Sequence, residues 1–175
     1  LACLVEDEMD LGATVVDLGG GTTTIAIFFD GNVVFTDSIP IGGKHVTNDI
    51  ARGLSTSIIE AERIKTLHGS AILSPLDDRE SIEIPQIGEE VGSPVNLVEK
   101  SKIVGIIQPR IEELIELIKS SIVGSGFEGL AGHRIVLTGG ASQLPGVRDL
   151  VQQKFKKQVR IGRPIRANGL ADSVS

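Results

Sequence analysis

The chain has 175 residues, of which 41% are apolar and 23% charged, a composition typical of a globular domain with its own core. Its net charge of −6 and its lack of Trp and Tyr argue against nucleic acid as a partner, because neither a basic surface nor base-stacking platforms are present. A single cysteine excludes an internal disulfide and a cysteine metal cluster, and no apolar run approaches the ~18 residues that span a bilayer.

The first predicted feature is a hairpin that closes on glycines. β-Branched and apolar residues predict strands at 14–18 and 23–29, with three glycines at 19–21 between them. Residues without Cβ let the backbone take positive φ and let its amides approach a ligand closely. Such a row of donors suits a phosphate, beside which Asp17 would orient a hydrated Mg²⁺. An ordinary tight turn next to an acid is the alternative.

Residues 32–39 predict a third strand in an antiparallel meander, followed by a break at Pro40 and a short helix at 47–54. The Gly43-Lys44 pair between them does not fit the spacing GxxxxGK[ST]. A Walker nucleotide loop is therefore rejected.

A second helix is predicted from Ser57 to a stop signal at Gly69, because Ser57 and Glu60 have capping-box spacing. Glu62 and Lys65 lie three residues apart in this helix and are neighbours on one face. The chemistry alone favours a solvated ion pair. The alternative is a clamp on the vicinal hydroxyls of a ribose.

Residues 70–96 combine prolines and acidic pairs with short β-like pieces at 81–87 and 94–98. This composition predicts a small subdomain with exposed strands. Its acids, including Asp77 and Glu89, are expected to be solvated, because no His or Cys accompanies them at ligand spacing.

The longest periodic segment, 101–123, predicts an amphipathic helix with Ile or Leu at every third or fourth position. Pro109 is expected to kink or divide it. The polar face, which carries Lys102 and Arg110, is either a wet surface or a platform for a peptide.

Residues 134–138 predict a buried strand that leads through a glycine pair into a helix opened by Pro145. Doubly wound folds place such turns at the carboxyl ends of strands, where ligands bind. An ordinary tight turn is again the alternative.

Three motifs, taken in chain order, resemble the second half of the ATPase domain shared by actin, Hsp70 and the sugar kinases. They are Asp17-Leu-Gly-Gly-Gly-Thr22, Glu62-Arg-Ile-Lys65 and Thr138-Gly-Gly-Ala-Ser-Gln-Leu-Pro145. The resemblance implies an α/β fold: an actin-like, RNase H-like ATPase domain with a small inserted α+β subdomain. It also implies ATP as the ligand and Mg²⁺ bound through water to Asp17. The ATP-binding residues implied are Gly19, Gly20, Gly21, Thr22 and Thr23 at the phosphates, Glu62 and Lys65 at the ribose, and Gly139, Gly140 and Ala141 at the adenosine.

Within this superfamily the sequence is most similar to the FtsA family of bacterial actin-like cell-division proteins, over nearly all of its length. The similarity implies subdomain 2A at 1–47 and 124–175, with subdomain 2B inserted at 48–123. It implies a protein at the inner face of the membrane at the division site, which forms filaments, contacts other divisome proteins and links FtsZ filaments to the membrane. The C-terminal peptide of FtsZ would dock on subdomain 2B, with Lys102 and Arg110 as contacts.

The first phosphate loop of the superfamily and the membrane-binding C-terminal helix of FtsA are not matched, and the chain starts at Leu1. We therefore expect a fragment that cannot enclose ATP from both sides and that leaves membrane binding to the full-length protein. Thr24 stands where related loops have a second acid, so little or no ATP hydrolysis is expected. The alternative function is half of an Hsp70-like chaperone or of a sugar-kinase-type phosphotransferase.

Overall fold

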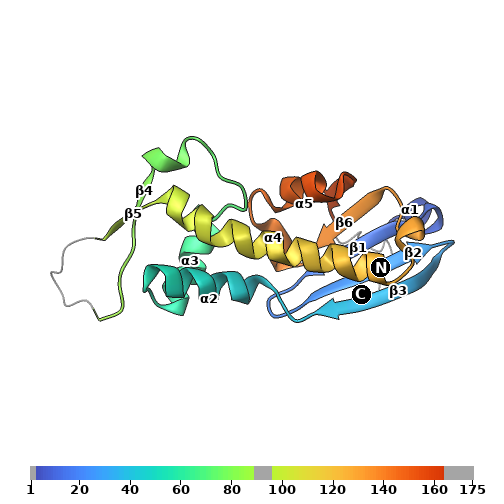
Figure 1. The fold of residues 1–175 in the computed structure, drawn as a ribbon, viewed down its shortest axis with the longest axis horizontal. Coiled ribbons are helices and arrows are strands. Elements are labelled where there is room, and N and C mark those ends of the chain that lie inside the picture. The colour runs from blue at the N-terminus through green and yellow to red at the C-terminus, as the bar shows by residue number, and fades with distance from the viewer. Residues whose placement is uncertain (1–2, 89–95, 164–175) are drawn as a thin grey trace, which may run out of the picture.

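The structure, a computed structural model, describes residues 3–88 and 96–163. One end of the molecule is a five-stranded sheet with the order β3-β2-β1-β6-β7 (Figure 1). β1, β2 and β3 form an antiparallel meander, while β6 and β7 run parallel to β1. The strands predicted at 14–18, 23–29, 32–39 and 134–138 are confirmed. The bounds are β1 Ala13–Leu18, β2 Thr23–Phe29, β3 Asn32–Ile39, β6 Arg134–Thr138 and β7 Gln158–Ile161.

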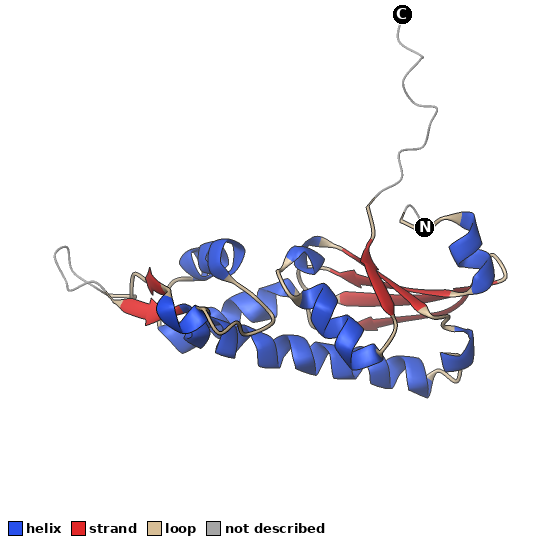
Figure 2. Ribbon diagram, turned by 90° about the horizontal axis from the view of Figure 1, so that it is seen from above, coloured by secondary structure: helices blue, strands red, loops and turns tan. Residues whose placement is uncertain are grey.

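The other end is built by helices and a small hairpin of β4 (Ser81–Glu83) and β5 (Leu97–Glu99) (Figure 2). α4 is a long helix that runs from this hairpin to the sheet and packs against both α2 and β3. Along the chain, α1 precedes β1, and α5 connects β6 to β7. The helices are α1 Glu6–Leu11, α2 Gly43–Leu54, α3 Ile58–His68, α4 Lys100–Gly124 and α5 Val147–Phe155, with 3-10 turns at Asp77–Arg79, Glu128–Leu130 and Gly140–Gln143.

Apolar side chains of α4 join the two ends into one core. The predicted stripe is buried throughout: Ile103, Ile107, Ile111, Leu114, Ile118 and Ile122. The same cluster contains Leu137 of the sheet and Ile50 of α2. α4 continues through Pro109, so of the two outcomes predicted for this proline, a kink or a division of the helix, the division is wrong. Pro109 lies on the exposed side, and burial of the opposite face stabilises the helix across it.

The other face of the sheet carries a smaller cluster of Leu4, Ala13, Phe28 and Val136. The segment around α1 covers it, since Met9 packs against the same cluster. Apolar clusters therefore lie on both faces of the sheet, while most of the edge strand β3 stays exposed.

Two predicted helix starts are corrected by the structure. α2 begins at Gly43 rather than at 47, because the amides of Gly43 and Lys44 donate to the carbonyl oxygens of Gly19 (2.9 Å) and Gly20 (2.8 Å). α5 begins at Val147, two residues after Pro145. The predicted cap of α3 is confirmed, since Ser57 Oγ accepts a hydrogen bond from the Glu60 amide at 3.2 Å.

The expectation that Asp77 is solvated is wrong. Its side chain is buried, accepts a hydrogen bond from the Ser74 amide at 2.7 Å and lies 3.5 Å from Lys100 Nζ. Lys100 also forms an ion pair with Glu80. The first residue of α4 is thus bound to the segment that precedes β4. Glu89 and part of the strand predicted at 94–98 lie outside the described residues.

The predicted subdomain boundaries fall within helices. Residue 48 lies in α2, and residue 123 is the penultimate residue of α4. The division into subdomains 2A and 2B stays a prediction. Among the described residues, no helix is both long and apolar enough to cross a membrane.

Candidate functional site

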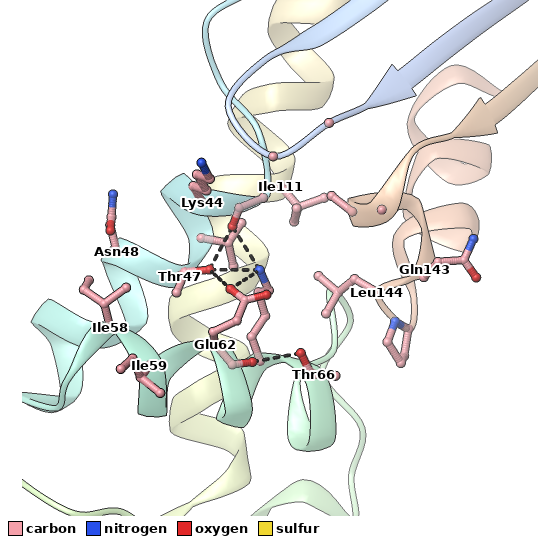
Figure 3. A pocket seen from close by; sticks show the side chains of 18 residues that line it. Lys44, Thr47, Asn48, Ile58, Ile59, Glu62, Thr66, Ile111, Gln143 and Leu144 are labelled. Atoms are coloured by element: carbon pink, nitrogen blue, oxygen red, sulfur yellow. Dashed lines mark hydrogen bonds and ion pairs between the residues drawn. The ribbon is translucent and has the colours of Figure 1, made fainter.

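The three motifs meet at one cavity of about 780 Å³ between the sheet and the helical end (Figure 3). The glycine loop after β1, one face of α3 and the turn after β6 form its walls. Six predicted ligand-binding residues line it: Gly19, Gly20, Glu62, Lys65, Gly140 and Ala141. Segments more than 100 residues apart in the sequence thus form one site.

The glycine loop differs in conformation from the prediction. None of the residues at 19–21 has positive φ. Close approach requires glycine at position 19, where a Cβ would lie 2.8 Å from the Thr22 carbonyl oxygen, and at position 42, where it would lie 2.5 Å from the Gly19 carbonyl oxygen. Within the described part of the chain the amides of Gly20 and Gly21 have no acceptor, so they are available to an anion.

The Glu62–Lys65 pair is only partly solvated, because the Glu62 side chain is 52% exposed. Lys65 Nζ lies 2.8 Å from Glu62 Oε2, 2.9 Å from Thr47 Oγ1 and 3.2 Å from the Gly43 carbonyl oxygen. The Lys65 side chain is only 16% exposed. Burial raises the pKa of Glu62, but hydrogen bonds from Lys65 and Thr47 outweigh it and hold that pKa below its ordinary value. The pair is therefore a fixed, ionised group at the cavity wall.

The turn after β6 depends on Gly139, which has φ +85°. The Ser142 hydroxyl and amide both donate to the Gly139 carbonyl oxygen, at 2.7 and 3.2 Å. Beyond it Ala141 packs on α2, because a Cβ on Gly43 would lie 3.2 Å from the Ala141 Cβ. The turn thus brings Gly140 and Ala141 to the cavity.

Five predicted site residues do not line the cavity: Asp17, Gly21, Thr22, Thr23 and Gly139. Thr23 is fully buried and donates to the Ile41 carbonyl oxygen at 2.8 Å, which is a structural role. Gly21 and Thr22 are exposed in the loop, and Asp17 is exposed at the end of β1. Within the described residues no cluster of three metal-ligating side chains occurs.

Four side chains of α2 that the sequence did not indicate also line the cavity: Lys44, Val46, Thr47 and Asn48. Lys44 lies along the glycine loop, since a Cβ on Gly20 would be 3.6 Å from its Cε. The rejected Walker pattern had left Lys44 without a role. Lys44 and Thr47 are three residues apart, so they lie on the same face of a helix only if that helix includes both. The sequence placed the helix start at 47, whereas α2 begins at Gly43.

The two predicted peptide contacts lie on α4, away from the cavity. Lys102 is exposed and has no ion-pair partner among the described residues. Arg110 is held within the molecule: its Nε lies 2.6 Å from Asp49 Oδ2, and it also pairs with Glu113. Arg110 therefore joins α4 to α2.

Solved structures of proteins with the actin-like ATPase fold are similar to this chain. MreB5 of Spiroplasma citri bound to ADP gives a TM-score of 0.72 at 20% identity, covering 93% of this chain and 52% of that chain. A MamK double helical filament gives 0.67 at 18% identity, covering 90% and 51%. The expected actin-like ATPase fold is thereby confirmed.

Sequence comparison gives a narrower result. The model of the family described as cell division protein FtsA matches residues 14–175. Cell division protein FtsA of Agrobacterium fabrum is 49% identical over 170 residues, and that of Escherichia coli K12 is 39% identical over 176. Each match covers 97% of this chain but only 38% and 41% of the relative, so the chain spans about two fifths of their length. The chain belongs to the FtsA family of cell division proteins.

Proposed function

We propose that the full-length protein binds ATP with its second half at this cavity, as an actin-like cytoskeletal protein of bacterial cell division. The observation that carries the proposal is the convergence of three distant motifs on one cavity of about 780 Å³, a size suited to a nucleotide. The MreB5 structure of the same fold has ADP bound, which supports the same class of ligand.

The residues present fit a nucleotide. The free amides of Gly20 and Gly21 and the ammonium of Lys44 would bind phosphate oxygens, and Glu62 would accept from ribose hydroxyls. Mg²⁺, held through water by Asp17, would neutralise phosphate charge. Asp17 faces Thr24 across the β1–β2 ladder, so a second carboxylate is not supplied there. We therefore expect little or no hydrolysis, and a turnover assay with sugar acceptors or unfolded peptides separates this role from a phosphotransferase or chaperone.

Removal of the ribose clamp tests the nucleotide site. We expect Lys65→Ala and Glu62→Ala in the full-length protein each to weaken the binding of Mg-ATP by about tenfold, because Glu62 supplies the charged acceptor and Lys65 holds it in place. Titration calorimetry measures the affinity.

The same helix offers a matched control. Glu60 and Arg63 form an i,i+3 ion pair on α3 that does not line the cavity. Glu60→Ala and Arg63→Ala should leave the affinity unchanged. Equal losses in both pairs of variants would show that the effect comes from the helix rather than from the clamp.

We further propose that the full-length protein forms filaments, contacts other divisome proteins and links FtsZ to the membrane at the division site. Membership of the FtsA family supports this role. The C-terminal peptide of FtsZ is proposed to dock beside α4, where the exposed ammonium of Lys102 would attract an acidic segment.

Lys102→Glu tests the docking surface better than Arg110→Glu. The Arg110 variant would place a carboxylate against Asp49 and Glu113, which disturbs the contact of α4 with α2 even without a partner. We expect Lys102→Glu to weaken the binding of the FtsZ peptide about threefold, the usual effect of losing an exposed charge pair, with ATP binding unchanged. Lys119→Glu, exposed on the same helix, is the control in fluorescence titrations. Equal weakening by both variants would reject docking at Lys102.

A further inference from the structure

Thr47 joins three parts of the cavity wall. It lies in the first turns of α2 and is only 3% exposed. Its Oγ1 lies 2.5 Å from Glu62 Oε2, 2.9 Å from Lys65 Nζ and 3.1 Å from the Gly43 carbonyl oxygen. A hydroxyl has one proton and accepts from the ammonium, and of the two acceptors within reach the carboxylate oxygen is the nearer and the charged one. Figure 3 shows the Thr47 side chain directed at Glu62.

The bonds of Lys65 leave one oxygen of Glu62 for a ligand. An ammonium has three donors, and Lys65 has three acceptors: Glu62 Oε2, Thr47 Oγ1 and the Gly43 carbonyl oxygen. Both Lys65 and Thr47 bind the same oxygen of Glu62, Oε2. Among the described residues Oε1 has no partner, so it is the acceptor left free at the cavity wall.

The same group is connected to the glycine loop. The Gly43 amide donates to the Gly19 carbonyl oxygen at 2.9 Å, and the Gly43 carbonyl oxygen accepts from Lys65 at 3.2 Å. The first turn of α2 therefore lies between the loop and the Glu62–Lys65 pair. A displacement of this turn would move both ends of the site together.

We propose that Thr47 is a positioning residue, which holds Glu62 so that Oε1 accepts from a ribose hydroxyl while the glycine loop binds phosphate. The proposal rests on the proposed nucleotide site and specifies how that site distinguishes a ribose from a sugar without hydroxyls. Thr47 lines the cavity, and in this proposal it acts on the ligand through Glu62. Its effect should therefore depend on the hydroxyls of the ligand and not on its phosphates.

The test compares ATP with 2′,3′-dideoxy-ATP, both with Mg²⁺, on the full-length protein. We expect the unaltered protein to prefer ATP by about tenfold, the value of a hydrogen bond to a charged group. Thr47→Val keeps the shape but removes the hydroxyl, and should reduce the preference to less than about threefold, with a larger loss of affinity for ATP than for dideoxy-ATP. Thr47→Ser should restore the preference. Thr47→Ala serves as a second variant if Thr47→Val does not fold.

The outcomes separate this inference from the proposed function. No binding of either nucleotide by the unaltered protein would contradict the nucleotide site itself. A preference for ATP that persists in Thr47→Val and Thr47→Ala would overturn only the role of Thr47. Equal weakening of both nucleotides in these variants would also overturn it, because it would indicate a purely structural contribution.

Discussion

Gly139→Ala is expected to lower the free energy of unfolding of this chain by about 3 kcal/mol. Gly139 has φ +85° and ψ 164°, a region that is essentially restricted to glycine. A Cβ there would lie 2.5 Å from the Leu18 carbonyl oxygen and closer still to Asp17 Oδ1. An alanine at this position would therefore suffer both backbone strain and a collision with β1, and a shift of the loop would not relieve both. Urea unfolding measures the change.

The neighbouring glycine is a matched control. Gly140 has no positive φ, and a Cβ there would meet nothing within 4 Å. Gly140→Ala should change the free energy of unfolding by less than about 0.5 kcal/mol. Similar midpoints for the two variants would show that the turn after β6 tolerates a side chain at Gly139.

Glu8→Gln is the second substitution with a large expected effect. Glu8 is buried in α1, and its carboxylate accepts from Arg160 Nε at 2.9 Å and from Arg134 Nη1 at 3.1 Å. The hydrogen bond from Arg160 is the main reason that the pKa of Glu8 falls from 4.5 to about 2. Burial opposes this shift, and hydrogen bonds from the Val5 amide and from Arg134 add to it. This shift corresponds to about 3 kcal/mol of stability at neutral pH, most of which the neutral amide should lose.

The stabilisation by Glu8 should decrease as the pH falls. Because the folded-state pKa lies below the unfolded one, the contribution of Glu8 is complete above about pH 4.5 and is lost as the pH falls toward 2. The difference between the unaltered chain and Glu8→Gln should therefore be about 3 kcal/mol at pH 7 and shrink below pH 4.5. Glu6→Gln, exposed in the same helix, is the control. A difference that stays constant from pH 7 to pH 3 would contradict the assignment to Glu8.

Two ion pairs of this structure could not be predicted from the sequence. Glu8 and Arg160 are separated by 152 residues, and neither has a neighbour in the sequence that indicates the other. Arg110 likewise binds Asp49, 61 residues away, where the sequence suggested a free cation. Ion pairs of this kind depend on which strands and helices lie side by side.

The sequence by itself determined the elements whose signals are local. Runs of β-branched and apolar residues predicted β1, β2, β3 and β6, and Ile and Leu spacing predicted the buried face of α4. Ser57 predicted the start of α3 because a cap bonds within its own turn. The order of the three motifs also predicted the actin-like fold and the six cavity residues that the structure brings together.

Only the tertiary structure decided features that rest on contacts between distant segments. α2 begins at Gly43 because the glycine loop supplies acceptors for its first amides, which no local pattern encodes. Asp77 is buried because Lys100 approaches it, and α4 continues through Pro109 because its opposite face is packed. Thr47 acquires its place between Glu62 and Lys65 in the same way, since side-chain geometry at the cavity exists only once α2 and α3 pack together.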